Sequence, residues 1–331
     1  MNDLAVLMES VAVDPLVDHP ADFHVFHRFL ERCKALPPIA TSVCWPLSEV
    51  ALRGAVEASL AGIITPTFVG LKDRLPALAK KIGLDITGFP IVDAATEEQA
   101  AQISVAMCRD GRAQAMMKGS LHTDELMRAV LARDTGLRTS RRISHVFVMD
   151  TPAYPRTVLI TDAAINIEHD LEDKIHIVQN AIDLAHALGI PKPKVALLSA
   201  IETVNPKIRS TLDAAALCKM ADRGQITGGL LDGPLAFDTA VSAKAAQIKG
   251  LVSQVAGQAD ILVAPDLESG NMLAKQLEYL GGAQLAGIVL GARVPVILTS
   301  RADSAATRLT SCAVALLLHH ASNPIDEKGI G

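Results

Sequence analysis

The 331-residue sequence is poor in aromatic side chains and has no excess of positive charge. It contains seven Phe, two Tyr and one Trp, although half of its residues are apolar. The core must therefore be aliphatic, a composition that suits a parallel sheet covered by helices. Lysine and arginine number 31 against 36 acidic residues, which gives a net charge of −5. This balance does not favour binding to the phosphate backbone of nucleic acid, so no nucleic-acid partner is predicted.

Long apolar runs and paired cysteines are also missing. The longest uninterrupted apolar runs, such as 312–318, fall far short of the roughly 20 residues that span a bilayer. The N-terminal segment MNDLAVLMES is acidic and lacks the pattern of a secretory signal. The five cysteines are scattered and include no Cys-x-x-Cys pair, which argues against a disulfide framework or a cysteine zinc site. We expect a cytoplasmic protein with no membrane partner and no metal.

Strand-like and helix-like segments alternate along most of the chain. The predicted strands are 39–45, 63–69, 90–92, 113–117, 143–149, 157–161, 194–200, 261–264, 288–290 and 294–298. The predicted helices are 47–60, 72–82, 97–109, 124–132, 171–188, 206–222 (with Asn205 as N-cap), 271–280 and 304–319. Such repeated alternation predicts an α/β fold with mostly parallel sheets.

The length suggests about two domains of roughly 150 residues each. The proline-containing stretch 150–156 is the best candidate for a crossover between them. In one economical arrangement the second domain is inserted into the first, which the final strand and helix complete.

The sequence VPVILTSRADS, residues 294–304, leads from a predicted strand through a turn to a helix. Free N–H groups and the positive end of the helix dipole favour an anion there, and Arg301 adds a two-pronged donor for phosphate. The carboxyl edge of an open α/β sheet is where ligands bind. The alternative is that Ser300 or Asp303 only caps the helix and that Arg301 pairs with a surface carboxylate.

Two further segments place positive charge beside predicted strands. The segment MKGSLHTD (117–124) offers Lys118, and Gly119 allows close approach of the backbone to a ligand. The segment GLRTSRR (136–142) contains three arginines just before a strand, although such a cluster can simply be a solvated loop. Together these segments predict a localised anion site. No Gly-x-Gly-x-x-Gly fingerprint or Walker A loop is present.

A series of runs in the second part of the chain carries a family resemblance. They are MMKGSLHTDELMRAV, ISHVFVMD, LITDAAINI, LEDKIHIVQNAIDLAHALGI, PKVALLSAIETVNPKI, LDGPLAFDTAVS, VAGQADILVAPDLESGNMLAKQL and VPVILTSRADS. In this order, from about 113 to 320, they resemble the phosphate acetyltransferase / phosphate butyryltransferase family. The residues before them carry little diagnostic sequence.

The resemblance implies a soluble acyltransferase for which acyl-CoA plus inorganic phosphate gives acyl phosphate plus CoA. CoA, inorganic phosphate and a short-chain acyl phosphate are the implied partners, with CoA as a substrate and no tightly bound cofactor. It implies two α/β/α domains similar to the isocitrate and isopropylmalate dehydrogenases, namely residues 1–148 plus 293–331, which carry the Ser-Arg pair, and an inserted domain, 149–292. The active site is expected in the cleft between them, and a homodimer is usual.

The resemblance also assigns site residues. Arg301 matches the catalytic arginine that binds the phosphoryl group, and Ser300 matches the serine beside it. Where acetyltransferases have an aspartate as the base for the CoA thiol, this sequence has Thr307. Asp303 lies four residues earlier, on the same face if the helix begins there, and is the candidate base, with capping as its alternative role. Together with the charged segments described above, this gives as candidates for binding phosphate or CoA Lys118, Ser120, His122, Thr123, Arg138, Arg141 and Asn271.

Three other functions compete with this interpretation. A phosphate acyltransferase that acts on acyl-ACP in lipid synthesis would need a long apolar channel and a basic docking face. A non-catalytic protein that binds CoA or acyl phosphate is compatible with threonine at position 307. A metal- and NAD-dependent dehydrogenase is the least favoured, because the sequence lacks a carboxylate metal cluster.

Overall fold

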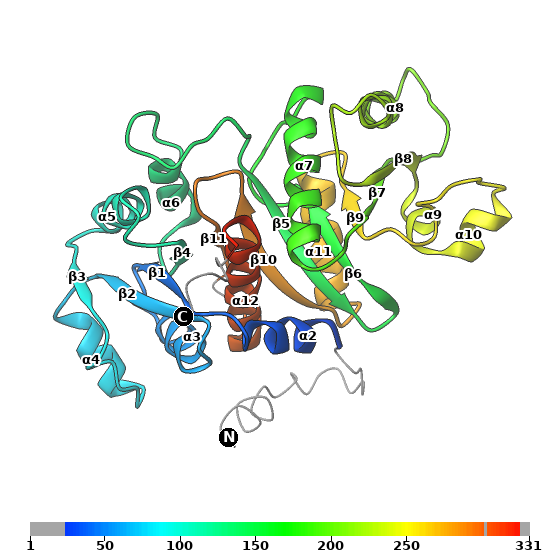
Figure 1. Ribbon diagram of the computed structural model, residues 1–331. Helices are drawn as coiled ribbons and strands as arrows, with labels where there is room; N and C mark the ends of the chain where they lie inside the picture. The colour runs from blue at the N-terminus through cyan, green and yellow to red at the C-terminus, as the bar shows by residue number, and fades with distance from the viewer. Residues whose placement is uncertain (1–23, 301–302, 325–331) are drawn as a thin grey trace, which may run out of the picture. The chain divides into compact units, whose positions relative to one another are not determined.

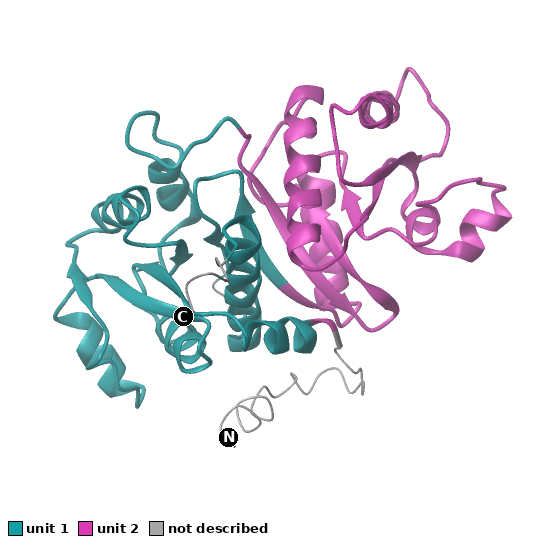
Figure 2. Cartoon of the chain, viewed as in Figure 1, with its two compact units in different colours: residues 1–22, 26–140, 286–331 teal, residues 23–25, 141–285 magenta. Residues whose placement is uncertain are grey.

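The computed structural model describes residues 24–300 and 303–324. The chain divides into two compact units, which Figure 2 shows in different colours. Within the described residues, unit 1 comprises 26–140 and the part that begins at 286, whereas unit 2 comprises 24–25 and 141–285. Unit 1 is therefore built from two separate stretches of chain.

Unit 1 contains a mostly parallel run of strands in the order β3-β2-β1-β4-β11-β10 (Figure 1). These strands are β1 (Ile39–Cys44), β2 (Ile64–Gly70), β3 (Ile91–Asp93), β4 (Ala115–Lys118), β10 (Gln284–Leu290, most of which lies in unit 1) and β11 (Val296–Ile297). The pair β10–β11 is antiparallel and the others are parallel. The chain runs outward through β1, β2 and β3, then returns to β4 on the other side of β1. This reversal creates a topological switch point between β1 and β4.

Helices cover both faces of this part of the sheet. They are α2 (His24–Cys33), α3 (Glu49–Leu60), α4 (Arg74–Lys81), α5 (Glu97–Arg109), α6 (Thr123–Val130) and α12 (Ala305–Ser322). Helix α3 packs against α12, and α5 packs against α6. Right-handed crossovers place α3 and α5 on opposite faces, because the connections β1–β2 and β3–β4 run in opposite directions across the sheet.

Unit 2 has the strand order β5-β6-β9-β7-β8. Its strands are β5 (Ser144–Thr151), β6 (Tyr154–Thr161), β7 (Lys194–Leu198), β8 (Leu230–Leu235) and β9 (Ile261–Val263). Its helices are α7 (Leu171–Ala187), α8 (Arg209–Asp222), α9 (Phe237–Val241), α10 (Ala243–Ile248) and α11 (Leu267–Tyr279). The pair β5–β6 is antiparallel, and the other pairs are parallel. Aliphatic side chains from β6, β7, β9 and α11 form its buried core, as the scarcity of aromatic residues predicts.

The predicted alternation and mostly parallel sheets are confirmed, and the helix predicted over 97–109 has these bounds in the structure. The N-cap predicted at Asn205 is wrong, because α8 begins at Arg209 and the Asn205 side chain instead accepts a hydrogen bond from the N–H of Lys207. The stretch 150–156, predicted as a crossover, joins β5 and β6 in a hairpin within unit 2. The unit boundaries, at 140/141 and 285/286, precede the predicted domain boundaries by several residues.

Sequence reasoning missed β8, α9 and α10. The run that forms β8 contains Asp-Gly-Pro, which indicates a turn rather than a strand. A proline is tolerated here because β8 pairs with β7 alone and forms an edge. Among the described residues, no helix has both the length and the apolar composition needed to cross a membrane.

Candidate active site

The carboxyl ends of three neighbouring parallel strands, β1, β4 and β11, meet at one edge of unit 1. Each strand leads into a loop followed by a helix, α3, α6 or α12. The switch point between β1 and β4 lies at this edge, where open α/β sheets bind their ligands. The edge therefore brings together two of the segments predicted to bind an anion, at 117–124 and 294–304.

The loops after β1 and β4 are tied together by Gly119 and Ser120. The N–H groups of these residues donate to the carbonyls of Cys44 and Trp45 at 2.8 and 2.9 Å. A Cβ at position 119 would overlap those carbonyls, so glycine is required there. The Ser120 hydroxyl donates to the Trp45 carbonyl at 2.8 Å and accepts from the N–H of Leu47 at 3.2 Å. Ser120 thus helps to build the loop, whatever it contributes to a ligand.

In the segment between β11 and α12, both backbone polar groups of Ser300 are hydrogen-bonded to charged side chains. Its N–H donates to the Asp303 carboxylate at 2.6 Å, and its carbonyl accepts from the Arg308 guanidinium at 2.7 Å. Ser300 itself is exposed, whereas Asp303 is buried. Arg301, the predicted catalytic arginine, lies outside the described residues.

The N-cap of α12 is Ser304, whose hydroxyl accepts from the N–H of Thr307 at 3.1 Å. Neither Ser300 nor Asp303 caps the helix, so the capping alternative for these residues is wrong. The argument that Asp303 and position 307 share a helix face also does not apply, because α12 begins only at Ala305. Asp303 instead organises the turn ahead of the helix.

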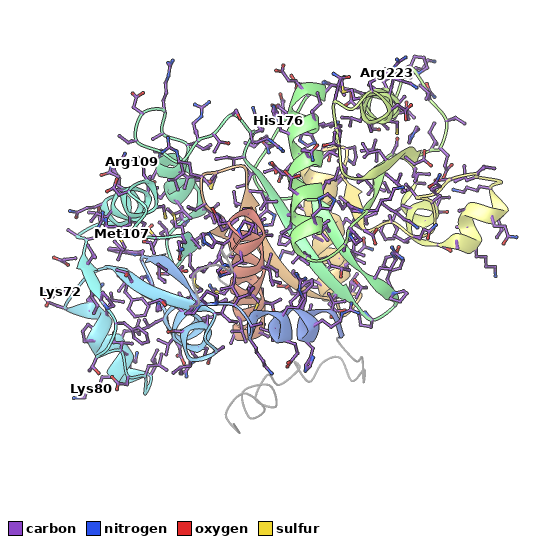
Figure 3. The ribbon with its side chains drawn as sticks, viewed as in Figure 1. Lys72, Lys80, Met107, Arg109, His176 and Arg223 are labelled. Atoms are coloured by element: carbon purple, nitrogen blue, oxygen red, sulfur yellow. The ribbon has the colours of Figure 1, made fainter. Side chains whose placement is uncertain are left out.

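Two cations are buried beneath this turn. Many lysines of unit 1 project from the surface, as Lys72 and Lys80 do in Figure 3. By contrast, Lys118 is only 3% exposed and Arg308 only 2%. The Lys118 ammonium donates to the Thr299 carbonyl at 3.5 Å, and the Arg308 guanidinium donates to the Thr299 hydroxyl at 2.6 Å. Because both side chains are buried, their charges act on the turn with less screening than they would at the surface.

Sequence reasoning missed Arg308. It lies four residues before Cys312, which is fully buried, and residues four apart share a face of a helix. A cation near a helix N-terminus also opposes the helix dipole, which is a signal in itself. Burial lowers the pKa of the Arg308 guanidinium, whereas the Asp303 carboxylate acts to raise it.

Of the other predicted residues of unit 1, His122 and Thr123 follow β4 at this edge, whereas Arg138 lies beside the loop that precedes β11, at the opposite edge of the sheet. His122 is the exposed N-cap residue of α6 but makes no side-chain cap, and its N–H lies 3.4 Å from the Glu97 carboxylate. Thr123 is the first residue of α6 and is half-buried. Arg138 is exposed and forms an isolated β-bridge with Ala292.

Two predicted residues belong to unit 2. Arg141 donates to the carboxylate of Asp183 at 3.2 Å. Asn271, on α11, donates to the Ala163 carbonyl at 3.0 Å. Both side chains therefore have protein partners within their own unit.

Unit 2 has its own polar turn after β6, which is organised by buried Asp162. Its carboxylate accepts from the N–H groups of Ala164, Ile165 and Asn166 at 3.0 to 3.2 Å, and also from the Asn166 side chain. Nearby His145 is fully buried, and neither of its ring nitrogens has a hydrogen-bond partner among the described residues. Burial lowers its pKa to about 4, with Asp162 acting to raise it and Lys275 to lower it.

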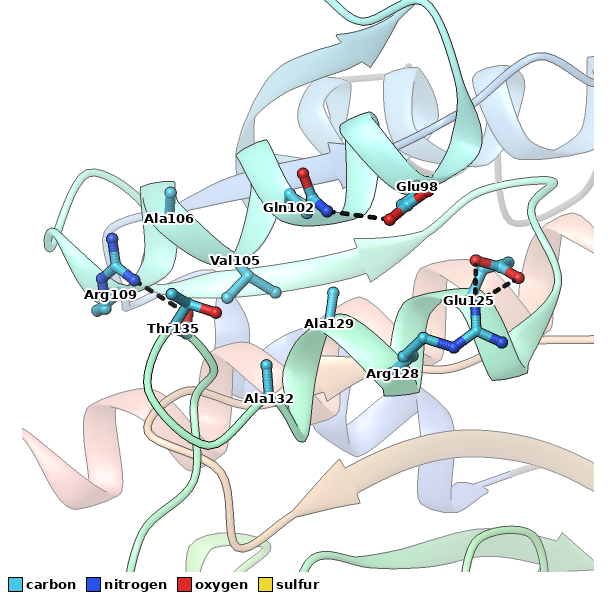
Figure 4. A pocket seen from close by; sticks show the side chains of 10 residues that line it. All are labelled: Glu98, Gln102, Val105, Ala106, Arg109, Glu125, Arg128, Ala129, Ala132 and Thr135. Carbon is cyan, nitrogen blue, oxygen red and sulfur yellow. Dashed lines mark hydrogen bonds and ion pairs between the residues drawn. The ribbon is translucent and has the colours of Figure 1, made fainter.

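A separate groove of about 510 Å³ lies between α5 and α6 of unit 1 (Figure 4). Its lining residues are Glu98, Gln102, Val105, Ala106, Arg109, Glu125, Arg128, Ala129, Ala132 and Thr135. Both arginines are engaged, since Arg128 donates to Glu125 at 2.8 Å and Arg109 to the Thr135 carbonyl at 3.0 Å. The residues predicted to bind phosphate do not line this groove. Within the described ranges, no group of three or more His, Cys, Asp or Glu side chains is arranged to hold a metal ion.

A switch point beside a strand–helix turn with buried cations defines an α/β protein suited to holding an anionic ligand at its sheet edge. The family described as phosphate acetyl/butaryl transferase matches residues 95–316. The chain is 57% identical over 298 residues to a phosphate acetyltransferase of Rhizobium meliloti, covering 90% of this chain and 94% of the relative. Accordingly, the chain belongs to the phosphate acetyl/butyryl transferase family.

Two further comparisons agree with this assignment. The chain is 42% identical over 293 residues to a phosphate butyryltransferase of Clostridium acetobutylicum, covering 88% of this chain and 97% of the relative. The fold is similar to the crystal structure of a branched-chain phosphotransacylase from Enterococcus faecalis. That match has a TM-score of 0.75 and 32% identity, and it covers 85% of this chain and 99% of the other.

Proposed function

We propose that this protein is a phosphate acyltransferase that moves a short acyl group, acetyl or butyryl, reversibly between CoA and inorganic phosphate. The observation that carries the proposal is the family match over 95–316, together with relatives of both names that align with nearly nine-tenths of the chain. The buried cations at the β11–α12 turn add a physical reason, because phosphate and acyl phosphate are anions.

In the proposed reaction the CoA thiolate attacks the acyl carbonyl of the acyl phosphate directly. A carbon–sulfur bond forms, the bond from the carbonyl carbon to the phosphate oxygen breaks, and inorganic phosphate leaves with the electron pair. Arg301 and the N-terminus of α12 stabilise the charge that grows on the phosphate. Holding both substrates together supplies much of the acceleration, up to about 7–11 kcal/mol in well-aligned systems. No covalent enzyme intermediate is needed.

The thiol of CoA, with a pKa near 8.5 like that of free cysteine, must lose its proton before it attacks. We propose that Asp303, a buried carboxylate three residues after Ser300, accepts this proton. Its carboxylate accepts from the Ser300 N–H at 2.6 Å and therefore lies directly beside the candidate site. The Ser300 hydroxyl is proposed to donate a hydrogen bond to the thiol sulfur or to the charge that develops beside it.

The remaining features of the proposal follow the sequence analysis and the family resemblance. Lys118, Ser120, His122, Thr123 and Arg138 contribute to binding phosphate or CoA from unit 1, and Arg141 and Asn271 contribute from unit 2. The segment that forms unit 2 is an insertion into the first domain. The enzyme works in the cytoplasm as a homodimer, with CoA as a substrate and no tightly bound cofactor.

The test is an assay of purified protein with CoA and either acetyl phosphate or butyryl phosphate, followed by thioester absorbance. We expect thioester formation that depends on both substrates, and the ratio of the two kcat/KM values gives the acyl preference. CoA binding by calorimetry with no thioester from any short acyl phosphate would instead support the non-catalytic alternative. Turnover only with acyl-ACP would favour the lipid-synthesis alternative.

A further inference from the structure

Arg308 occupies a costly position. Its charge is 2% exposed, it lies near the N-terminus of α12 where the helix dipole opposes a cation, and its Nε has no hydrogen-bond partner among the described residues. Stability alone does not favour this arrangement, since a buried apolar side chain in its place would carry none of these costs. These costs are consistent with a role for Arg308 in holding neighbouring groups in place.

The guanidinium contacts two consecutive residues of the β11–α12 turn. One nitrogen donates to the Thr299 hydroxyl at 2.6 Å and another to the Ser300 carbonyl at 2.7 Å. The Ser300 N–H is held from the other side by the Asp303 carboxylate at 2.6 Å. Both backbone polar groups of Ser300 are thus fixed by charged side chains, while the residue itself is exposed.

The aliphatic part of Arg308 is held by α3. A Cβ added at Gly54 would lie 2.7 Å from the Arg308 Cδ and 3.2 Å from its Cβ. Glycine in the middle of a helix costs about 1 kcal/mol relative to alanine, yet only glycine leaves room here for the arginine. Helix α3 therefore packs closely against the aliphatic part of Arg308.

We propose that Arg308 is a positioning residue for acyl transfer: seated against Gly54, its planar guanidinium fixes the Thr299–Ser300 turn so that Ser300 faces the reacting atoms. This inference rests on the proposed function and deepens it. Lysine at this position would keep the charge but could not donate to both acceptors in the same fixed geometry.

The first test compares Arg308→Lys with the native protein in the acyl phosphate and CoA assay. We expect kcat to fall about 100-fold, as misplacement of a reacting group by about 1 Å can cause, while KM for CoA stays within about twofold. The matched control is Arg109→Lys, since Arg109 also donates to a backbone carbonyl in unit 1 but lies on α5. This control should keep the native kcat.

The second test is a double-mutant cycle with Gly54→Ala and Arg308→Ala. Gly54→Ala should lower kcat about tenfold in the native background but leave kcat unchanged in Arg308→Ala, because the added methyl group then has no arginine to displace. Circular dichroism and thermal melting establish that each variant is folded. Should Arg308→Ala not fold, Arg308→Lys provides the decisive comparison.

Two results would overturn the proposal: a folded Arg308→Lys protein with native kcat, or equal effects of Gly54→Ala with and without Arg308. A native protein that makes no thioester would contradict the proposed function instead, so the two failures are distinguishable.

Discussion

Each unit has a turn after a sheet strand that is organised by one buried aspartate, but the two carboxylates have different partners. In unit 2, Asp162 accepts from three consecutive backbone N–H groups and one asparagine side chain. In unit 1, Asp303 accepts from the Ser300 N–H, and the buried cations Lys118 and Arg308 donate to the same turn.

This difference indicates a structural role for the turn after β6 and a ligand-binding role for the turn after β11. Neutral N–H donors saturate the carboxylate of Asp162 and leave no cation hydrogen-bonded to it among the described residues. At the unit 1 turn, by contrast, two buried cations donate to Thr299 and Ser300 beside the buried acid, an arrangement suited to an anionic ligand. Equivalent positions in a sheet therefore do not imply equivalent roles.

The largest effect should follow from Arg301→Ala. Removing a donor to the departing phosphate is expected to lower kcat by about 1000-fold, because the charge that grows on this leaving group is stabilised mainly in the transition state. Thermal melting should show an unchanged Tm, and the exposed Arg112→Ala is the matched control with native activity. Native turnover by Arg301→Ala would remove the basis for placing chemistry in unit 1.

Asp303→Asn sharpens the comparison between the two aspartates. The amide oxygen can still accept from the Ser300 N–H, so the turn should persist while the base is lost. We expect kcat to fall about 100-fold and the acidic limb of the pH–rate profile to disappear. If the profile keeps its native shape, Asp303 serves only the turn, as Asp162 does in unit 2.

Lowering the pH should reduce the stability of unit 2, because the buried His145 ring must then be protonated. The folded-state pKa of this ring is about 4, below its ordinary value of 6.5, so the stability contribution is complete above pH 6.5 and is lost as the pH falls toward 4. At pH 5 the loss should be about 2 kcal/mol. Urea unfolding at pH 7 and pH 5 measures it, with His145→Leu as the comparison. An equal loss in both proteins would assign the effect to other groups.

The smallest effect concerns the helix caps that follow a strand in each unit. Ser304→Ala and Asp266→Ala each remove the side chain that caps α12 or α11, and each should lower the free energy of unfolding by about 1 kcal/mol. Kinetics separate the two variants, because only Ser304 borders the proposed active-site turn. Equal kcat values in both variants would show that the α12 cap has no influence on the chemistry.

Much of the fold could be predicted from periodicity and turn residues. The helix at 97–109 begins after Thr96, whose hydroxyl accepts from the Gln99 N–H, and both the cap and the apolar spacing are local features of the sequence. Helix α11 begins at Leu267, four residues before the predicted start. The prediction began too late because Gly270 interrupts the helical pattern of the sequence. In the structure this glycine packs against the Asp162 carbonyl. Local patterns fail where a tertiary contact explains the residue.

The candidate site divides in the same way. The strand–turn–helix order around Ser300 and the presence of Lys118 follow from local sequence, and so does the family resemblance. The N-cap of α12 is defined by one hydrogen bond, from the Thr307 N–H to the Ser304 hydroxyl. Sequence alone could not decide whether Ser300, Asp303 or Ser304 would make it.

The order of residues was sufficient to determine an aliphatic α/β fold and a polar turn ahead of the last helix, because periodicity, capping and turn chemistry act over a few residues. Only the tertiary structure decided that Arg308 lies against Gly54 and that Asp303 and Arg308 hold opposite sides of one serine. Those relations depend on how distant segments pack, and packing selects among side-chain conformations that the local sequence leaves open.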